Sequence, residues 1–193
     1  MTADLLSRAE VVAAAAEELG IRTAIIGAMA LAAHNYVRAT ADIDLASFAD
    51  PFEELPRLVQ KLESLGFRAS LNALDEEDAL GGVVRVWESE DDDGDPIDPI
   101  DIVNFRNPYR SGANPGEDAV RNAIRLEDHG ALRYARLPEL VALKLHAGNR
   151  RDQADVVEVL ARNPDADSDD IREVCRRFGY EEVFEELLAE ARG

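Results

Sequence analysis

The sequence predicts an α/β fold, in which a mixed sheet of about four to six strands is flanked by helices and followed by a C-terminal helical extension. Two long stretches, residues 3–19 and Phe52–Leu65, carry apolar residues at the spacing of an amphipathic helix, and short β-rich runs lie between and after them. From Pro138 onward, the apolar positions keep helical spacing to the end of the chain. The 193 residues are enough for one core domain with a helical appendage.

The N-terminal elements place a glycine between a strand and a helix. Residues 3–19 are the first predicted helix, which Gly20 can end. The apolar run Thr23–Ile26 is the first predicted strand and stops at Gly27, and the Ala-rich segment Ala28–His34 is predicted to be helical. Because the first N–H groups of a helix carry positive partial charge, the turn at Gly27 is a candidate phosphate site.

Two aspartates alternate with apolar residues on the next predicted strand, Asp42-Ile43-Asp44-Leu45. Residues i and i+2 of a strand point to the same face and lie roughly 6.6 Å apart. Asp42 and Asp44 therefore share one face, and the apolar pair faces the core. Two carboxylates held side by side repel each other unless a divalent cation lies between them, and oxygen ligands suit Mg²⁺ or Mn²⁺.

The middle of the chain alternates predicted helix, strands and loops. Gly66 closes the helix Phe52–Leu65. Leu74–Leu80 is predicted to be a loop or one helical turn, and the acidic segment Glu88–Asp98 is predicted to be a hairpin loop in solvent. The predicted strands of this region are Phe67–Leu71, Gly82–Glu88 and Ile97–Phe105.

A third carboxylate for the metal site has two candidates, Asp98 and Asp101. An antiparallel neighbour of the Asp42–Asp44 strand could bring an acid to the same face. Asp101 is preferred, because Ile100 and Ile102 on either side of it would face the core, whereas Asp98 is followed by a proline and lies near the loop.

The second half of the chain is predicted to be mostly helical. Pro138 suits a first helical position. A turn is expected at His129-Gly130, and the predicted elements are the helix Glu117–Leu126, the strand Leu132–Ala135 and the helices Leu140–Ala147, Asp152–Ala161, Ser168–Phe178 and Glu181–Ala191.

Two basic residues are candidate phosphate ligands. Lys144 lies among apolar neighbours and must find an anion, which is either Asp152 or Asp155 in an interhelix ion pair or a bound triphosphate. Arg38 is open to similar alternatives, a nucleotide phosphate or an ion pair with Asp42 or Asp44. His146, two positions after Lys144, is expected to face elsewhere, on the surface.

The composition is strongly acidic. The chain has 21 basic and 40 acidic residues, a net charge of −19, and this disfavours nonspecific binding to nucleic acid. Adaptation to high salt is one explanation of the acidity, and a high-GC genome would explain the excess of arginine over lysine. Cys175 is the sole cysteine and lies on an apolar helical stripe, so it is predicted to be buried filler. No apolar run is long enough to span a membrane and no signal peptide is apparent, so a cytoplasmic location is expected.

Residues 21–47 resemble a known family. The stretch is similar to the nucleotidyltransferase superfamily with a polymerase-beta-like palm, on the motif Gly27-Ala28 followed by Arg38-x-Thr40-x-Asp42-Ile43-Asp44. The branch it resembles most is that of AbiEii-type toxins. In this chain, the pattern Leu-x-x-Leu-Lys-Leu-His-Ala, followed by Arg150-Arg151-Asp152-x-x-Asp155-Val156, looks like the C-terminal signature of that branch. The resemblance implies a palm domain over residues 1–136 and a helical extension over 137–193 that closes one side of the active site.

The resemblance also implies a reaction, the transfer of a nucleoside monophosphate from an NTP to an acceptor with release of pyrophosphate. Asp42 and Asp44 would bind two Mg²⁺ (or Mn²⁺) ions, and Asp101 would bind the ion nearer the acceptor and help to deprotonate it. Gly27, Ala28, Arg38, Thr40 and Lys144 would hold the nucleotide phosphates. Members of the family often have Ser or Gly where this chain has Ala28, so a hydroxyl that could contact phosphate is absent.

Three functions stay open at this point. The chain is an active nucleotidyltransferase, a noncatalytic protein on the same fold that binds a nucleotide or a partner, or the toxin of a toxin–antitoxin pair. In the last case its acceptor would be tRNA or protein, and a small antitoxin protein would be its partner. The acidic composition argues against tRNA unless arginines gather on one face.

Overall fold

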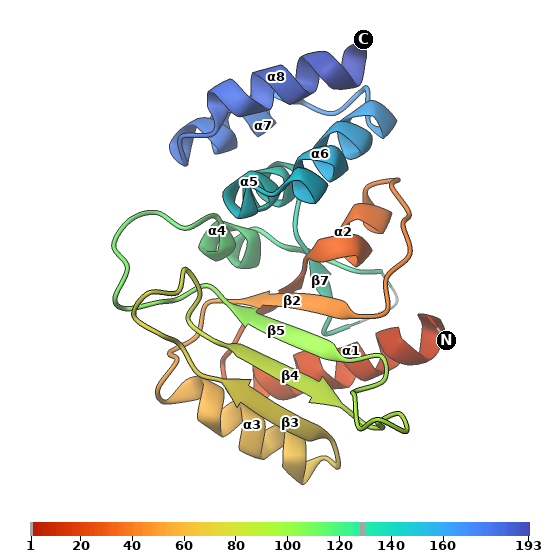
Figure 1. The fold of residues 1–193 in the computed structure, drawn as a ribbon, viewed down its shortest axis with the longest axis vertical. Helices are drawn as coiled ribbons and strands as arrows, with labels where there is room; N and C mark the ends of the chain where they lie inside the picture. The colour runs from red at the N-terminus through yellow and green to blue at the C-terminus, as the bar shows by residue number, and fades with distance from the viewer. Residues whose placement is uncertain (1, 128–129) are drawn as a thin grey trace.

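A computed structural model describes residues 2–127 and 130–193 and contains a seven-stranded mixed sheet in the order β3-β4-β5-β2-β1-β7-β6 (Figure 1). The strands are β1 (Thr23–Ile25), β2 (Ile43–Ser47), β3 (Arg68–Asn72), β4 (Val83–Trp87), β5 (Ile100–Asn104), β6 (Ile124–Arg125) and β7 (Arg133–Tyr134). The helices are α1 (Thr2–Glu18), α2 (Gly27–Ala33), α3 (Glu54–Ser64), α4 (Pro115–Arg121), α5 (Leu137–Ala147), α6 (Arg150–Arg162), α7 (Ser168–Arg177) and α8 (Glu181–Arg192).

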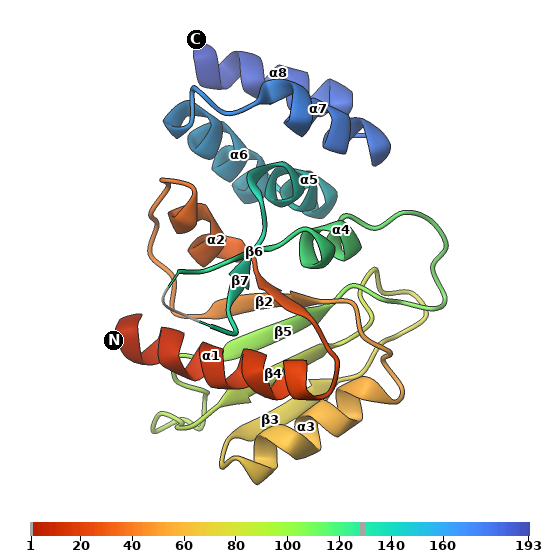
Figure 2. The ribbon, with the colours of Figure 1, turned by 180° about the vertical axis from the view of Figure 1, so that it is seen from behind.

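The helices form two groups around the sheet. α1 and α3 lie together against one face, as Figure 2 shows from behind, and α2 and α4 pack beside β2. α5 lies above α4, and α6, α7 and α8 stack beyond it (Figure 1). On the side opposite α1 and α3, no described helix covers β4 and β5 (Figure 1). The predicted mixed sheet flanked by helices, with helices following it, is therefore confirmed, although the sheet has seven strands rather than four to six.

Strand alternation separates an apolar face of the sheet from a charged one. The apolar face packs against α1 and α3 and includes Ile43, Leu45, Val84, Val86, Ile100 and Ile102, each at most 1% exposed. The residues between them on the central strands point to the opposite face. Asp44, Asp101 and Arg85 are therefore placed together on the side of the sheet that α1 and α3 leave uncovered.

The pairing of β2 with β5 corrects one expectation. The two strands are parallel rather than antiparallel, with Asp44 directly beside Asp101. The reason is the connection between them: α3, β3 and β4 intervene, and β5 returns antiparallel to β4. The expected strand over Ile97–Phe105 is shorter, because the loop before it continues to Asp98, whose φ is 47°.

The predicted helix Glu117–Leu126 is wrong at its C-terminal part. α4 begins earlier, at Pro115, because Asn114 caps it by accepting a hydrogen bond from the Gly116 N–H. It ends at Arg121, and Ile124–Arg125 instead pairs antiparallel with β7. The turn predicted at His129-Gly130 falls partly outside the described residues.

The C-terminal helices were predicted correctly, and Cys175 is buried as expected. α5 begins at Leu137 with Pro138 in its first turn, and it is buried on nearly all sides between α4, α6 and α7. Phe184 of α8 is fully buried and joins this layer to the core. Within the described parts of the chain, no helix combines the length and the apolar composition that crossing a bilayer requires.

Candidate active site

Gly27 lies in direct contact with Asp44. The Ile26 N–H donates to the main-chain oxygen of Asp44 over 2.9 Å, which holds the end of β1 against β2. Gly27 has a φ of +61°, and a Cβ atom there would lie 2.1 Å from Asp44 Oδ2. A glycine is therefore required for two reasons, its left-handed backbone and the close approach of the carboxylate. The turn therefore places the first residue of α2 against the Asp44 carboxylate.

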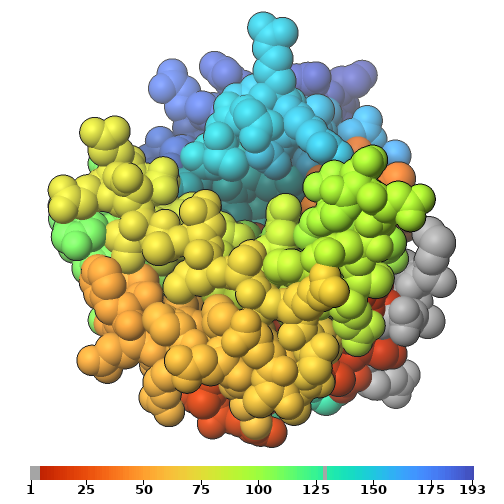
Figure 3. All heavy atoms as spheres, turned by 60° about the horizontal axis from the view of Figure 1, so that its bottom comes forward, coloured from red at the N-terminus to blue at the C-terminus, as the bar shows by residue number. Residues whose placement is uncertain are grey.

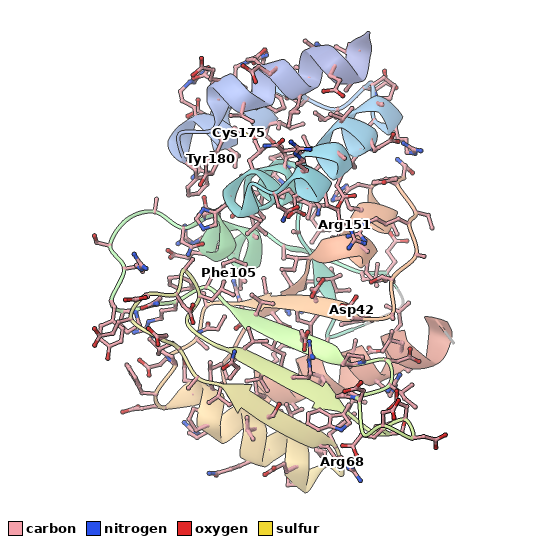
Figure 4. All side chains as sticks on the ribbon, in the orientation of Figure 1. Asp42, Arg68, Phe105, Arg151, Cys175 and Tyr180 are labelled. Atoms are coloured by element: carbon pink, nitrogen blue, oxygen red, sulfur yellow. The ribbon has the colours of Figure 1, made fainter. Side chains whose placement is uncertain are left out.

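Asp42 and Asp44 lie at the start of β2. Asp42 stands one residue before the strand, below α2 (Figure 4), and its Oδ1 accepts a hydrogen bond from the Thr40 hydroxyl. Burial raises the pKa of the Asp44 carboxyl to about 6, and the negative charges of Asp42 and Asp101 act in the same direction. Lys144 and Arg38 oppose this shift. Asp44 thus lies between two carboxylates and two cations.

Asp101 is held by an arginine that the sequence analysis did not identify. Arg85 of β4 is directly opposite Asp101, and its Nε and Nη2 donate to Oδ1 and Oδ2 of Asp101 over 2.8 and 2.7 Å. Both oxygens of this buried carboxylate are therefore occupied. The alternation within Val83–Trp87 indicates that Arg85 leaves the core, but the sequence does not contain the pairing of β4 with β5.

The two candidates for a third carboxylate lie in different surroundings. Asp101 is beside Asp44, whereas Asp98 lies in the preceding loop with its Oδ2 3.8 Å from a guanidinium nitrogen of Arg8 on α1. The preference for Asp101 therefore agrees with its position in the sheet. Its role as a metal ligand or base stays a prediction.

Lys144 and Arg38 share one anionic partner. Lys144 Nζ lies 2.7 Å from Asp152 Oδ1 and 2.7 Å from Asp155 Oδ2, and Arg38 Nε lies 3.3 Å from Asp155 Oδ1. Both Lys144 and Asp155 are buried. The interhelix ion pair predicted for Lys144 is present with both aspartates. The ion pair of Arg38 is with Asp155 of α6 rather than with Asp42 or Asp44. This four-residue group therefore holds two cations in fixed positions with no net charge.

A cleft of about 460 Å³ opens beside Asp44 and Lys144. Its walls are mainly apolar and come from the loop before β4, the end of β5 and α5; they include Leu80, Val103, Phe105, Leu140 and Leu143. Figure 3 shows a hollow between the yellow-to-lime segments and the cyan helices, and Phe105, which lines the cleft, is labelled in Figure 4. The cleft can therefore take an apolar or planar group next to a charged centre.

His146 is exposed, as predicted, but it also lines the cleft together with Lys144. The two side chains have different partners, as expected, because Lys144 pairs with Asp152 and Asp155 of α6 whereas His146 does not, but both reach the same cleft. His146 Nδ1 lies 2.7 Å from the Tyr180 hydroxyl, and burial lowers the pKa of the imidazole. Tyr180 lies 34 residues from His146 in the chain, so no local sequence pattern indicates this contact.

The donor set fits one divalent cation better than two. Asp42 and Asp44 offer carboxylate oxygens, and a cation between them would relieve the charge repulsion that, after burial, raises the pKa of Asp44. Asp101 differs, because Arg85 holds both its oxygens. Among the residues that the structure describes, no three His, Cys, Asp or Glu side chains are close enough together to form a metal site.

The remaining predicted residues lie close to this centre in the chain. Ala28 is buried in the first turn of α2, and Ile26, which precedes the helix, provides no side-chain cap. Thr40 contacts Asp42 and is half-buried. Their proposed contacts with phosphate stay predictions.

Comparison with known proteins identifies the fold. No protein-family model matches the sequence, and no curated protein is similar to it. Among solved structures, an antigenic nucleotidyltransferase-like protein from Paracoccidioides brasiliensis is 16% identical, with a TM-score of 0.54 over 97% of this chain and 92% of that one. ANT(2″)-Ia, solved with adenylyl-2″-tobramycin, is 18% identical with a TM-score of 0.46 over 97% and 96% of the two chains. The likeness to the first shows a nucleotidyltransferase-like fold, and at this identity it shows the fold alone.

Proposed function

We propose that this chain is a metal-dependent nucleotidyltransferase. An acceptor oxygen or nitrogen attacks the α-phosphorus of an NTP, the bond from the α-phosphorus to the bridging oxygen breaks, and pyrophosphate leaves while the acceptor gives up one proton. The products are the nucleotidylated acceptor and pyrophosphate. The nucleotidyltransferase-like fold supports the reaction class.

The position of Asp44 carries this proposal. Asp44 lies at the end of an apolar cleft, in contact with the Gly27 turn, with carboxylates on one side and Lys144 and Arg38 on the other. Asp42 and Asp44 would hold Mg²⁺ or Mn²⁺, which supplies positive charge against the phosphates. A metal–triphosphate substrate requires carboxylates that bind the metal ion and, beside them, basic side chains that bind the phosphates, and this site contains both.

The other side chains then take defined places around the substrate. The apolar walls at Phe105, Leu140 and Leu143 would receive the nucleoside, and Lys144 and Arg38 would face the phosphates. Thr40 would orient Asp42 by the hydrogen bond it donates. In this proposal residues 1–136 form the palm, and residues 137–193 are the helical extension that closes the cleft from above.

Pyrophosphate release tests the activity. The wild type and Asp44→Asn are incubated with Mg²⁺ and each α-³²P-labelled NTP, alone and with candidate protein and RNA acceptors, and both label transfer and pyrophosphate are measured. We expect transfer by the wild type and a loss of at least about 10²-fold in Asp44→Asn. Glu76→Gln, a change of an exposed acid outside the cleft, is the matched control. Equal activity of Asp44→Asn and the wild type would refute the proposal.

A noncatalytic role is the second candidate, and the Arg85–Asp101 pair favours it. Arg85 donates to both oxygens of the third carboxylate, so neither oxygen is free to contact an acceptor without breaking that pair. Mg²⁺-dependent binding of an NTP without pyrophosphate release from any acceptor would support this alternative over catalysis.

Membership of the AbiEii-type branch, and a toxin role with it, is a narrower proposal. Support comes from the motif that carries the resemblance, because its Lys144, Asp152 and Asp155 form one contact group. A neighbouring gene for a small antitoxin and growth arrest on expression of the chain, relieved by Asp44→Asn, would support it. Expression of the active protein without any effect on growth would count against it.

A further inference from the structure

Arg85 and Asp101 form a planar two-bond pair within the candidate site. The β4–β5 register sets them directly opposite each other, and two parallel N–H···O bonds of 2.8 and 2.7 Å join the guanidinium to both carboxylate oxygens. Such bidentate pairs are among the stronger charged hydrogen bonds in proteins. The pair is held by two strands of the sheet, so its position does not depend on a flexible loop.

The exposure of the two partners is unequal. The Asp101 side chain is 11% exposed, whereas that of Arg85 is 50% exposed. The buried carboxylate therefore depends on the arginine for its charge balance, while the guanidinium still faces the open side of the sheet. Arg85 also places a positive charge near Asp42 and Asp44, since both carboxylates raise the pKa of the guanidinium.

We propose that Arg85 takes the place of a second metal ion: it withdraws Asp101 from coordination, so that the centre binds one divalent cation, on Asp42 and Asp44. This inference rests on the proposed function, because it concerns the metal of that same site. Asp101 is then a positioning residue that fixes Arg85. The half-exposed guanidinium is available to an anionic group of the bound substrate.

Counting bound Mn²⁺ tests the inference without any need for activity. Free Mn²⁺ is measured by electron paramagnetic resonance during titration of the wild type, Arg85→Met, Arg85→Lys and Asp101→Asn, and of the double variant Arg85→Met/Asp101→Asn. Arg68→Met is the matched control, because Arg68 is also an arginine paired with a carboxylate, Glu90, but lies on β3 away from the centre (Figure 4). Circular dichroism confirms that each variant is folded.

The expected pattern is specific to the pair. The wild type, Arg85→Lys, Asp101→Asn and Arg68→Met each bind one Mn²⁺ at the centre, whereas Arg85→Met binds a second ion or binds the first at least about tenfold more tightly. The double variant Arg85→Met/Asp101→Asn loses this additional or tighter Mn²⁺ binding. Arg85→Lys keeps the positive charge at position 85. If Arg85→Met does not fold, the prediction of one bound ion is tested on the wild type, Arg85→Lys and Asp101→Asn.

Two results would overturn the inference in different ways. Two ions in the wild type, or an unchanged count and affinity in folded Arg85→Met, would refute the role of Arg85 and leave the proposed function standing. No Mn²⁺ bound by the wild type, with the Asp42→Asn/Asp44→Asn variant indistinguishable from it, would refute both the inference and the metal-dependent function.

Discussion

The Asp44 carboxylate occupies the space that a side chain at Gly27 would need. A Cβ atom on Gly27 would lie 2.1 Å from Asp44 Oδ2, and the φ of Gly27 is +61°. Asp44, one of the predicted acids of the metal site, and the glycine turn at the start of α2 are therefore a single structural unit. A change at Gly27 must move Asp44, the turn or both.

Gly27→Ala should destabilise the fold and disable the site. We expect a loss of about 2–4 kcal/mol in the free energy of unfolding, from the left-handed backbone and the steric overlap together, measured by urea denaturation. Gly66→Ala is the control: Gly66 has a φ of +94°, but a methyl group there would meet no other part of the chain within 4 Å, so it reports backbone strain alone. Equal losses in the two variants would contradict the close approach to Asp44.

The raised pKa of Asp44 predicts that the site destabilises the metal-free protein. The value rises from 3.8 to about 6 in the folded state, so the folded state keeps a proton that the unfolded chain releases. The contribution of Asp44 to stability therefore falls as the pH rises from about 4 to 6, by at most about 3 kcal/mol, and stays low above pH 6. Asp44→Asn should accordingly be about 1–3 kcal/mol more stable than the wild type at pH 8 and nearly equal to it at pH 4.

Urea denaturation in the presence of EDTA at both pH values measures this difference. Removing any acid from a chain of net charge −19 relieves general repulsion, so Glu76→Gln, at an exposed position, supplies the background. A gain in Asp44→Asn no larger than in Glu76→Gln, or a gain that is the same at pH 4, would contradict the assignment.

Lys144→Met should be strongly destabilising because it leaves two carboxylates without their shared cation. Lys144 Nζ lies 2.7 Å from both Asp152 and Asp155, and Asp155 is buried. We expect a loss of about 2–4 kcal/mol, since of the two cations only Arg38 then remains beside the buried Asp155, and Asp152 loses its ion-pair partner. Replacement of Asp155 by Asn in the same chain should restore part of the stability.

The chain contains its own control for this prediction. Lys61, the other lysine, pairs with Glu18 over 2.7 Å, but the Glu18 side chain is 65% exposed. Lys61→Met should cost no more than about 1 kcal/mol. A loss in Lys144→Met as small as that in Lys61→Met, by thermal or urea denaturation, would mean that the Lys144 group is not a buried ion cluster in solution.

Local patterns in the sequence were sufficient for most elements of the fold. Helical spacing and the positions of Gly20, Gly27 and Pro138 predicted the helices, because capping and breaking residues act within one turn. The pattern failed at Ile124–Arg125, where a strand forms because a partner, β7, lies beside it. A two-residue strand has no periodicity of its own and depends on that pairing.

In the candidate site too, features set by neighbouring residues could be predicted from the sequence, and contacts between distant residues could not. The nearness of Asp42 to Asp44 could be predicted, because residues i and i+2 of an extended segment lie close together, although β2 begins only at Ile43. The parallel β2–β5 pairing, the contact of Arg85 with Asp101 and that of Tyr180 with His146 each join residues far apart in the chain. A single sequence does not contain strand order, so these contacts required the structure.

Binding of NTP and Mg²⁺ to the same centre is the central claim, and titration calorimetry tests it most directly. ATP, GTP, CTP and UTP are titrated with and without Mg²⁺ into the wild type and the Asp42→Asn/Asp44→Asn double variant, after circular dichroism shows that both are folded. We predict Mg²⁺-dependent binding of at least one NTP by the wild type and its loss in the double variant. Binding that persists in the double variant, or no binding of any NTP by the folded wild type, would contradict the account.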